Sequence, residues 1–231
     1  MLRIQERVLG SEHIITLKTW HNLAVALYGQ GKYAQAEAEN RAILVIRERV
    51  LGAEHPDTLM GRMNLANSLR AQGKYAEAET EHRAVLKIRE RVLGPEHSDT
   101  LMSRMNLANS LKVQGKYAEA EKEHRAVLKI QERVLGPEHP DTLMSRMNSA
   151  NALSSQGKTV EAGVELLATL RIQERVLGPE HPATLMSLSS IAACLRAQNQ
   201  LDEAREFARR AMDGRRKVSA PQGAETSKIR L

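Results

Sequence analysis

Apolar side chains recur at helical spacing along residues 74–94, KYAEAETEHRAVLKIRERVLG. Residues three or four positions apart share one face of a helix, so this spacing indicates an amphipathic helix. Glutamates crowd its start and basic residues crowd its end, which suits the helix dipole. Glu79 and Arg83 are spaced for an ion pair across one turn. Gly94 and Pro95 then end the helix.

Another helical pattern precedes it in residues 55–73, HPDTLMGRMNLANSLRAQG. We call this the first helix of a pair and residues 74–94 the second helix. Pro56 and Asp57 suit a first helical turn, and Gly73 suits a left-handed helix cap. Only two or three residues join the two helices, so we expect them to lie antiparallel. One such pair cannot bury its apolar face alone, which predicts that successive pairs stack. No segment shows a strand pattern.

The helix pair repeats with a period of 42 residues. Residues 52–93 and 94–135 differ at only seven of 42 positions. Near-copies of LGPEHPDTLM begin at Leu9, Leu51, Leu93, Leu135 and Leu177. A fixed period of this length is the signature of a repeat architecture.

The repeat frame also predicts the organisation of the chain. Residues 2–10 are identical to the end of a later second helix with its following glycine, LRIQERVLG. Residues 1–9 are therefore expected to be a half repeat, and 10–217 a five-repeat α-solenoid. Residues 218–231 are polar, basic and without periodicity, so we expect a disordered tail there.

The segment MNLANSLKVQGKYAEAEKEHRAVLKI, residues 105–130, resembles a tetratricopeptide repeat. The 42-residue spacing and the GPEHPDTL segment resemble the longer form found in kinesin light chains. The resemblance covers residues 2–213 and implies an all-α, right-handed superhelical solenoid of antiparallel helix pairs. It also implies close helix packing at small residues. These are Ala24, Ala66, Ala108, Ala150 and Ala192 in first helices, and Ala36, Ala78, Ala120, Ala162 and Ala204 in second helices.

One position departs from the family pattern. Trp20 stands where the family often has tryptophan, but Arg62, Arg104 and Arg146 occupy the same position in the middle repeats. Their aliphatic stems are expected to pack while their charged ends reach water.

Each linker carries a Glu-His pair, which raises three possibilities: a metal site, a catalytic pair, or a structural linker. A zinc site needs about four ligands converging on one point. Neighbouring linkers are two helix-packing distances apart, roughly 15–20 Å if the axes lay in line. We therefore favour the structural interpretation, in which the histidine caps or packs against the next helix. His82 and His124 lie within second helices and are expected to pack between repeats.

Composition narrows the function classes. The chain has 231 residues, a net charge of +6 and one cysteine, Cys194. A lone thiol suits a reducing compartment, no apolar run reaches the ~20 residues of a membrane helix, and the charged N-terminus is unlike a signal peptide. We therefore expect a cytoplasmic protein. No nucleophile constellation and no phosphate-binding or metalloprotease motif is visible, so no enzyme activity, cofactor or metal is predicted.

Function in such a solenoid is expected on its concave surface. The resemblance implies that first helices line this surface. The predicted peptide-binding groove consists of Met60, Met63, Asn67, Arg70, Met102, Met105, Asn109, Lys112, Met144, Met147 and Asn151. In the first repeat the corresponding positions are Lys18, His21, Val25 and Tyr28, and in the fifth they are Met186, Ser189, Ala193 and Arg196.

The spacing places these side chains on one helix face, where flexible methionines suit adaptable peptide binding. They are expected to face solvent; the alternative is that the methionines are core. The asparagines could hydrogen-bond a peptide backbone or be ordinary surface residues.

The sequence thus predicts a non-enzymatic protein-interaction scaffold that binds a protein or peptide segment in its groove. Two alternatives stay open. The spread basic residues, including RRAMDGRRK at 209–217, could bind nucleic acid or an acidic surface. The chain could also be a structural arm of a larger protein, and the exposed half repeat could support self-association.

Overall fold

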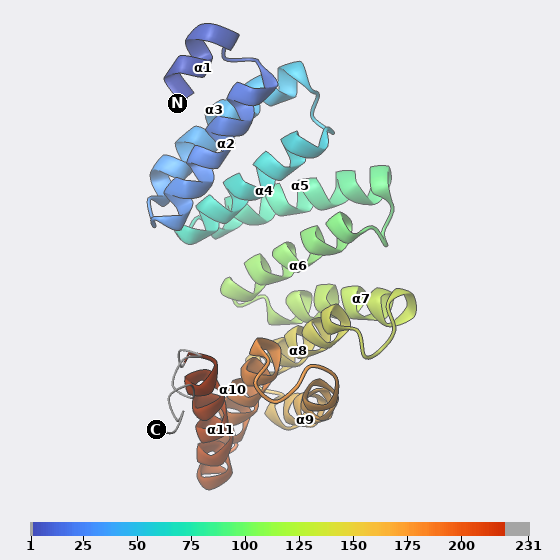
Figure 1. Cartoon of the computed structure of the whole chain (residues 1–231). Coiled ribbons are helices and arrows are strands. Elements are labelled where there is room, and N and C mark those ends of the chain that lie inside the picture. The colour runs from blue at the N-terminus through green and yellow to red at the C-terminus, as the bar shows by residue number, and fades with distance from the viewer. Residues whose placement is uncertain (1, 220–231) are drawn as a thin grey trace, which may run out of the picture. The chain divides into compact units, whose positions relative to one another are not determined.

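The computed structural model describes residues 2–219, and this part of the chain consists of eleven α-helices and no strand. Figure 1 shows the helices in chain order. The helices are α1 (Leu2–Leu9), α2 (Ile14–Gly29), α3 (Tyr33–Val50), α4 (Pro56–Ala71), α5 (Tyr75–Leu93), α6 (Ser98–Val113), α7 (Tyr117–Val134), α8 (Pro140–Ser155), α9 (Thr159–Val176), α10 (Pro182–Ala197) and α11 (Leu201–Ser219). None of these helices is long and apolar enough to cross a membrane.

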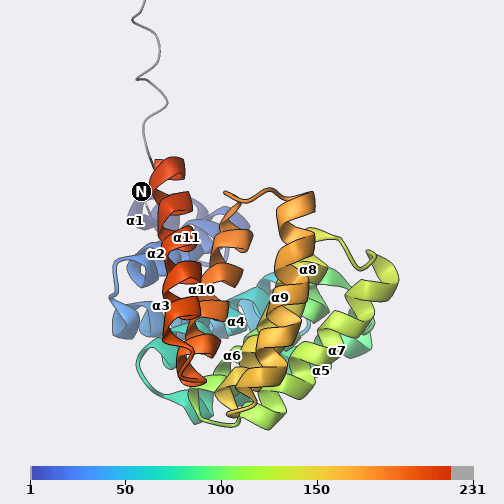
Figure 2. The same cartoon turned by 90° about the horizontal axis from the view of Figure 1, so that it is seen from below.

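The helices form two compact units, Met1–Glu123 and His124–Leu231, whose boundary falls within α7. In the first unit, α2 contacts α3, α3 contacts α4, α4 contacts α5, and α5 contacts α6. In the second unit, α8 to α11 contact one another in the same serial order, as Figure 2 shows for α10 and α11. Helix α11 continues to Ser219, two residues past the predicted end of the repeats. The remainder of the predicted tail, 220–231, lies outside the described residues.

Small residues lie where the helices approach most closely. The predicted alanine positions are almost fully buried in both units, for example Ala36, Ala66 and Ala78, which have no exposed surface. Ala192 in α10 differs because it is only half-buried. Leu44 of α3 packs with Leu65, Ala66 and Leu69 of α4, so this second helix is covered by the first helix of the next pair.

The linker histidines cap the first helices. His55 Nδ1 accepts a hydrogen bond from the Asp57 backbone N–H at 3.1 Å, and the same bond recurs at His13, His97, His139 and His181. A capping side chain satisfies one of the free N–H groups at a helix start. The structural interpretation of the histidines is therefore confirmed.

The glutamates of the Glu-His pairs join a linker to the last turn of the following second helix. Glu54 pairs with Arg91 at the end of the next second helix, and Glu12 with Arg49 and Glu138 with Arg175 repeat the arrangement. Among residues 2–219, no group of three or more His, Cys, Asp or Glu side chains is placed to hold a metal ion.

Arg62 and Arg104, which stand in the place of tryptophan, each form ion pairs with two second helices. Trp20 donates its indole N–H to Glu39. Arg104 pairs with Glu90 and, at 2.6 Å, with Glu123, the residue that corresponds to Glu39. The side chains of Arg62, Arg104 and Arg146 are 26%, 18% and 21% exposed, so their charged ends are held in ion pairs and are only partly exposed to water. A second carboxylate at this junction gives the charge a partner that water would otherwise supply.

A buried carboxylate fixes the register between successive pairs. Glu79 of α5 accepts hydrogen bonds from Arg83 at 3.0 Å, Gln114 at 2.8 Å and Lys116 at 2.7 Å. Burial alone would raise the pKa of Glu79, but the bonds from Lys116, Gln114 and Arg83 outweigh burial and hold the pKa at about 2. Glu37 is held in the same way by Arg41, Gln72 and Lys74. The predicted Glu79–Arg83 ion pair is thereby confirmed.

Replacing one capping histidine tests the role of the linkers. The His55→Ala substitution removes the acceptor for the Asp57 N–H and is expected to lower the free energy of unfolding by about 1 kcal/mol. His55→Asn keeps a capping acceptor and should lose clearly less. Urea unfolding followed by circular dichroism measures both. An asparagine variant as destabilised as the alanine variant would contradict the capping role.

Candidate peptide-binding surface

Two pairs of successive first helices are neighbours, one in each unit. Helix α2 contacts α4 in the first unit, and α8 contacts α10 in the second. The predicted groove positions on them differ in exposure. Met60 is 41% exposed, Met102 54% and Met186 46%, whereas Asn67, Asn151 and Met144 are half-buried. The predicted stripe is therefore only partly open to a ligand.

Three of the residues implied for the groove meet at one pocket in the first unit. Val25 and Tyr28 of α2 and Asn67 of α4 line a cavity of about 90 Å³, together with Ala24, Asn64 and Ser68. Asn40 of α3 also lines this cavity and is only 2% exposed. Its side-chain oxygen has no hydrogen-bond partner among the described residues. The pocket thus combines apolar walls with a buried polar group that a ligand could satisfy.

The next repeat places a histidine where the first has Asn40. His82 lies 42 residues later in α5, is 1% exposed, and neither ring nitrogen has a hydrogen-bond partner among residues 2–219. Burial, and secondarily the nearby Arg70 charge, lowers the pKa of His82 to about 4. His124, one repeat further on, is also buried. The burial of both histidines agrees with the predicted packing role.

Two predicted groove residues belong to the core instead. Met63 is 6% exposed and packs with Leu59 and Val85. Met147 is 1% exposed and lies in the core of the second unit. The expectation that they face solvent was wrong. Three residues along a helix leave a rotation of about 60° between Met60 and Met63, which is enough to turn Met63 toward α5 and α6.

A buried arginine completes the setting of Met63. Arg89 Nη1 donates to the Asp99 carbonyl oxygen at 2.9 Å, to Ser103 Oγ at 2.9 Å and to Met63 Sδ at 3.0 Å. Burial lowers the pKa of Arg89, against the opposing effect of Asp99. Arg47 makes the corresponding bond to the Asp57 carbonyl at 2.8 Å. These guanidinium groups tie α3 and α5 to the start of the next first helix.

Sequence reasoning missed Asn40, Asn64 and Ser68 as pocket residues. Asn40 lies on a second helix, whereas the predicted groove used first helices alone. A weak signal was present, because residues 40, 82 and 124 are polar at one position of a mainly apolar face, and Leu166 replaces them in the fourth repeat.

The buried Cys194 lies with its Sγ 3.4 Å from Ser154 Oγ.

Comparisons with known proteins agree with this architecture. Tetratricopeptide repeat profiles match residues 16–57, 58–99, 100–141 and 146–217, well over half of the chain. No curated protein sequence matches the chain significantly.

Solved structures show the same arrangement. One is the structure of the nearly identical tetratricopeptide-like repeats of a kinesin light chain from Podosopora anserina. Its sequence is 29% identical to this chain, the match covers 90% of this chain and 99% of that one, and the TM-score is 0.76. A variant of those repeats is 30% identical, covers 87% of this chain and 95% of its own, and has a TM-score of 0.77. BtubC (BKLC) from P. vanneervenii is 18% identical, covers 98% of this chain and 92% of its own, and has a TM-score of 0.75. The predicted fold class of stacked antiparallel helix pairs is confirmed.

A matched pair of substitutions tests the corrected position of the methionines. Met147→Glu buries a carboxylate and is expected to lower the free energy of unfolding by about 3 kcal/mol or more. Met186→Glu, in the same unit but 46% exposed, should change it by only about 0.5 kcal/mol. Thermal and urea unfolding compare the two. Equal tolerance of both substitutions would return Met147 to the solvent-facing surface.

The buried histidine predicts a specific pH dependence. Since the folded-state pKa of His82 is about 4 against an ordinary value of 6.5, its contribution to stability is fully present above pH 6.5. It falls as the pH drops from 6.5 to 4, by roughly 3 kcal/mol in total. His82→Leu, which copies Leu166, should remove this part of the dependence without loss of stability at pH 7. Unfolding free energies of both proteins at pH 7 and pH 4.5 measure it; identical pH dependence would contradict the assignment.

Proposed function

The chain belongs to the tetratricopeptide repeat family, and from that premise we propose that it is a non-enzymatic protein-interaction scaffold. Its ligand is a peptide segment held on the first-helix surface, and its site of action is the cytoplasm. The observation that carries the proposal is the pocket between α2 and α4, where residues of two successive first helices meet the buried Asn40.

The size and chemistry of the pocket suit a peptide. Its volume of about 90 Å³ is well below the roughly 300–1,000 Å³ of small-molecule sites, so it would take one side chain. Val25 and Tyr28 supply apolar contact, while the amides of Asn40 and Asn67 can donate to or accept from a polar group. Met60 lies exposed on the same helix as Asn67 and offers an adaptable neighbouring contact.

The remaining predicted groove residues extend this proposal to the other repeats. In the first unit the exposed Met102 and Asn109 of α6 provide further contact positions, with the half-buried Arg70, Met105 and Lys112 beside them. In the second unit Met144 and Asn151 of α8 occupy the corresponding places. Met63 and Met147 support the surface from the core.

The nucleic-acid alternative finds less support in the ion pairs. Within the basic stretch 209–217, Arg209 pairs with Glu206 at 2.8 Å, Arg210 with Glu174, and Lys217 with Glu180 at 3.3 Å. Paired charges attract phosphate less than free ones would. We therefore keep the peptide interpretation.

Two valine substitutions test the proposed surface. Val25 lines the pocket and is 48% exposed, whereas Val45 on α3 is 70% exposed and does not line it. Peptides would be selected against the intact wild-type chain from a displayed library, and their dissociation constants measured by fluorescence anisotropy. Val25→Glu is expected to weaken binding at least tenfold, because a carboxylate fills the apolar wall. Val45→Glu should leave binding within about twofold.

The outcomes are decisive because both variants should keep wild-type melting temperatures. Equal affinity losses in the two variants would show nonspecific charge repulsion and sink the proposal. A library that yields no peptide above background would also overturn it.

A further inference from the structure

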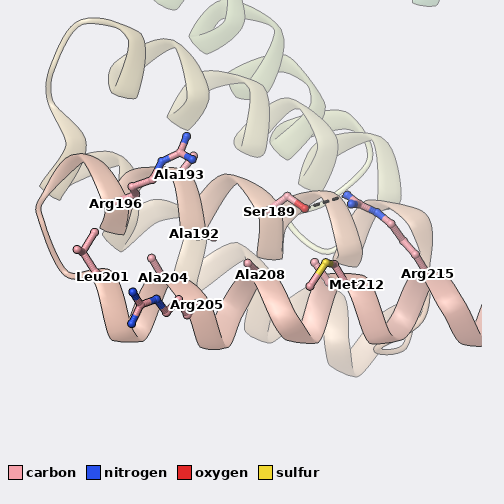
Figure 3. A pocket seen from close by; sticks show the side chains of 11 residues that line it. Ser189, Ala192, Ala193, Arg196, Leu201, Ala204, Arg205, Ala208, Met212 and Arg215 are labelled. Atoms are coloured by element: carbon pink, nitrogen blue, oxygen red, sulfur yellow. Dashed lines mark hydrogen bonds between the residues drawn. The ribbon is translucent and has the colours of Figure 1, made fainter.

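A second concave surface lies between the last two helices. Ser189, Ala192 and Ala193 of α10 and Ala204, Ala208 and Met212 of α11 line a groove of about 420 Å³, which Figure 3 shows along the length of both helices. Three arginines border it: Arg196 on α10, and Arg205 and Arg215 on α11. The floor is therefore apolar and made mainly of small side chains, while the rim is basic.

The 42-residue register shows what this kind of groove receives. Met212 corresponds to Leu86 and Leu170 of earlier second helices. Leu86 packs with Leu107 and Leu111 of the following first helix, α6. Leu170 lies in one core cluster with residues of the following first helix, α10. Met212 is instead 51% exposed. The groove thus has the form of an internal junction that accepts a helix carrying large aliphatic side chains.

The rim differs from the internal junctions in its charge. Arg205 stands at the position of Glu37 and Glu79, whose carboxylates bind Lys74 and Lys116 of the next pair. Arg215 stands at the position of Arg89, whose partner in the next helix is Ser103. Arg215 here bonds to Ser189 Oγ at 2.9 Å within its own pair. Arg205 pairs with Asp202 of its own helix at 3.0 Å, in an ion pair that is largely exposed. The terminal groove therefore still presents arginines at the positions that, in internal repeats, face the lysine following the incoming helix.

Charge decides between the possible occupants. A second copy would bring α2 into the groove, and Lys32, which corresponds to Lys74 and Lys116, would meet Arg205. Like charges at such contact are unfavourable. Residues 220–231 carry one acidic and two basic residues and only two large aliphatic ones, so they match the groove poorly as well.

We propose that the α10–α11 groove docks an acidic amphipathic helix of another protein. The aliphatic face of that helix packs on Ala192, Ala208 and Met212, and its carboxylates pair with Arg205 and Arg215. Its α10 side includes Ser189, Ala193 and Arg196, the positions that the family resemblance implies for the fifth repeat. It shares no residue with the pocket of α2 and α4, so neither proposal depends on the other.

The internal junctions supply the probe. A fluorescent peptide of residues 98–114, braced across the exposed positions 109 and 113 to hold it helical, carries Ser103→Glu and Gln114→Glu. Ser103 and Gln114 contact Arg89 and Glu79, so these carboxylates would face Arg215 and Arg205. A second peptide carries Ser103→Lys and Gln114→Lys. Anisotropy titrations with the intact chain are expected to show at least tenfold tighter binding of the acidic peptide.

Variants of the chain complete the test. Arg205→Glu combined with Arg215→Glu should weaken the acidic peptide at least tenfold and reverse the preference between the two peptides. Arg209→Glu combined with Arg216→Glu makes the same change in net charge on α11 outside the groove, and should leave binding within about twofold. Met212→Glu provides an independent loss of binding should the double variant fail to fold, as judged by circular dichroism.

Several results would overturn the proposal. These are that neither peptide binds, that both peptides bind the wild-type chain with the same affinity, or that the control variant loses as much affinity as the groove variant. Sedimentation of the chain alone supplies a further arm: self-association that Met212→Glu abolishes would make a second copy the occupant, contrary to the proposal.

Discussion

A helix pair of this chain leaves an apolar face that the first helix of the next pair covers, as α4 covers α3 and α10 covers α9, and most of the recurring residues serve that requirement. Alanines such as Ala66 and Ala78 are fully buried and allow the two helices of a pair to approach closely. Leu44 then packs with Leu65 and Leu69 of the following pair. Since burial is completed by a neighbour, the stability of one pair includes its interface with the next.

Apolar packing of this kind is non-directional, so polar contacts have to fix the register. Glu79 binds Gln114 at the end of α6 and Lys116 before α7, which allows only one position of the next pair. In the fourth repeat Gly163 replaces the glutamate, and Gln198 retains the bond to the Thr159 carbonyl oxygen, at 3.0 Å, that Gln72 and Gln114 make to the equivalent carbonyls. The apolar junction persists where the glutamate contact is absent. Apolar packing therefore holds successive pairs together, and polar contacts adjust their register.

The sequence allowed the helices, their antiparallel pairing and the capping histidines to be predicted, because each depends on local spacing or on exact repetition. The exposure of individual methionines could not be predicted in the same way. Met60 and Met63 share one broad helix face, and only the position of α5 and α6 decides that Met63 is covered. Asn40 was missed for a related reason: it meets Val25 and Asn67 only after three helices have packed.

The end of the array shows how one position can change the partner without changing the fold. An apolar groove lined by alanines would accept the chain's own α2, and a head-to-tail contact of that type need not close, so it risks extending into a filament. Arginine at position 205, where the first three repeats have a glutamate, opposes this contact because Lys32 would lie against it. The same arginine favours a helix that carries carboxylates. If the groove acts as we propose, a single reversal of charge both limits self-stacking and selects the ligand.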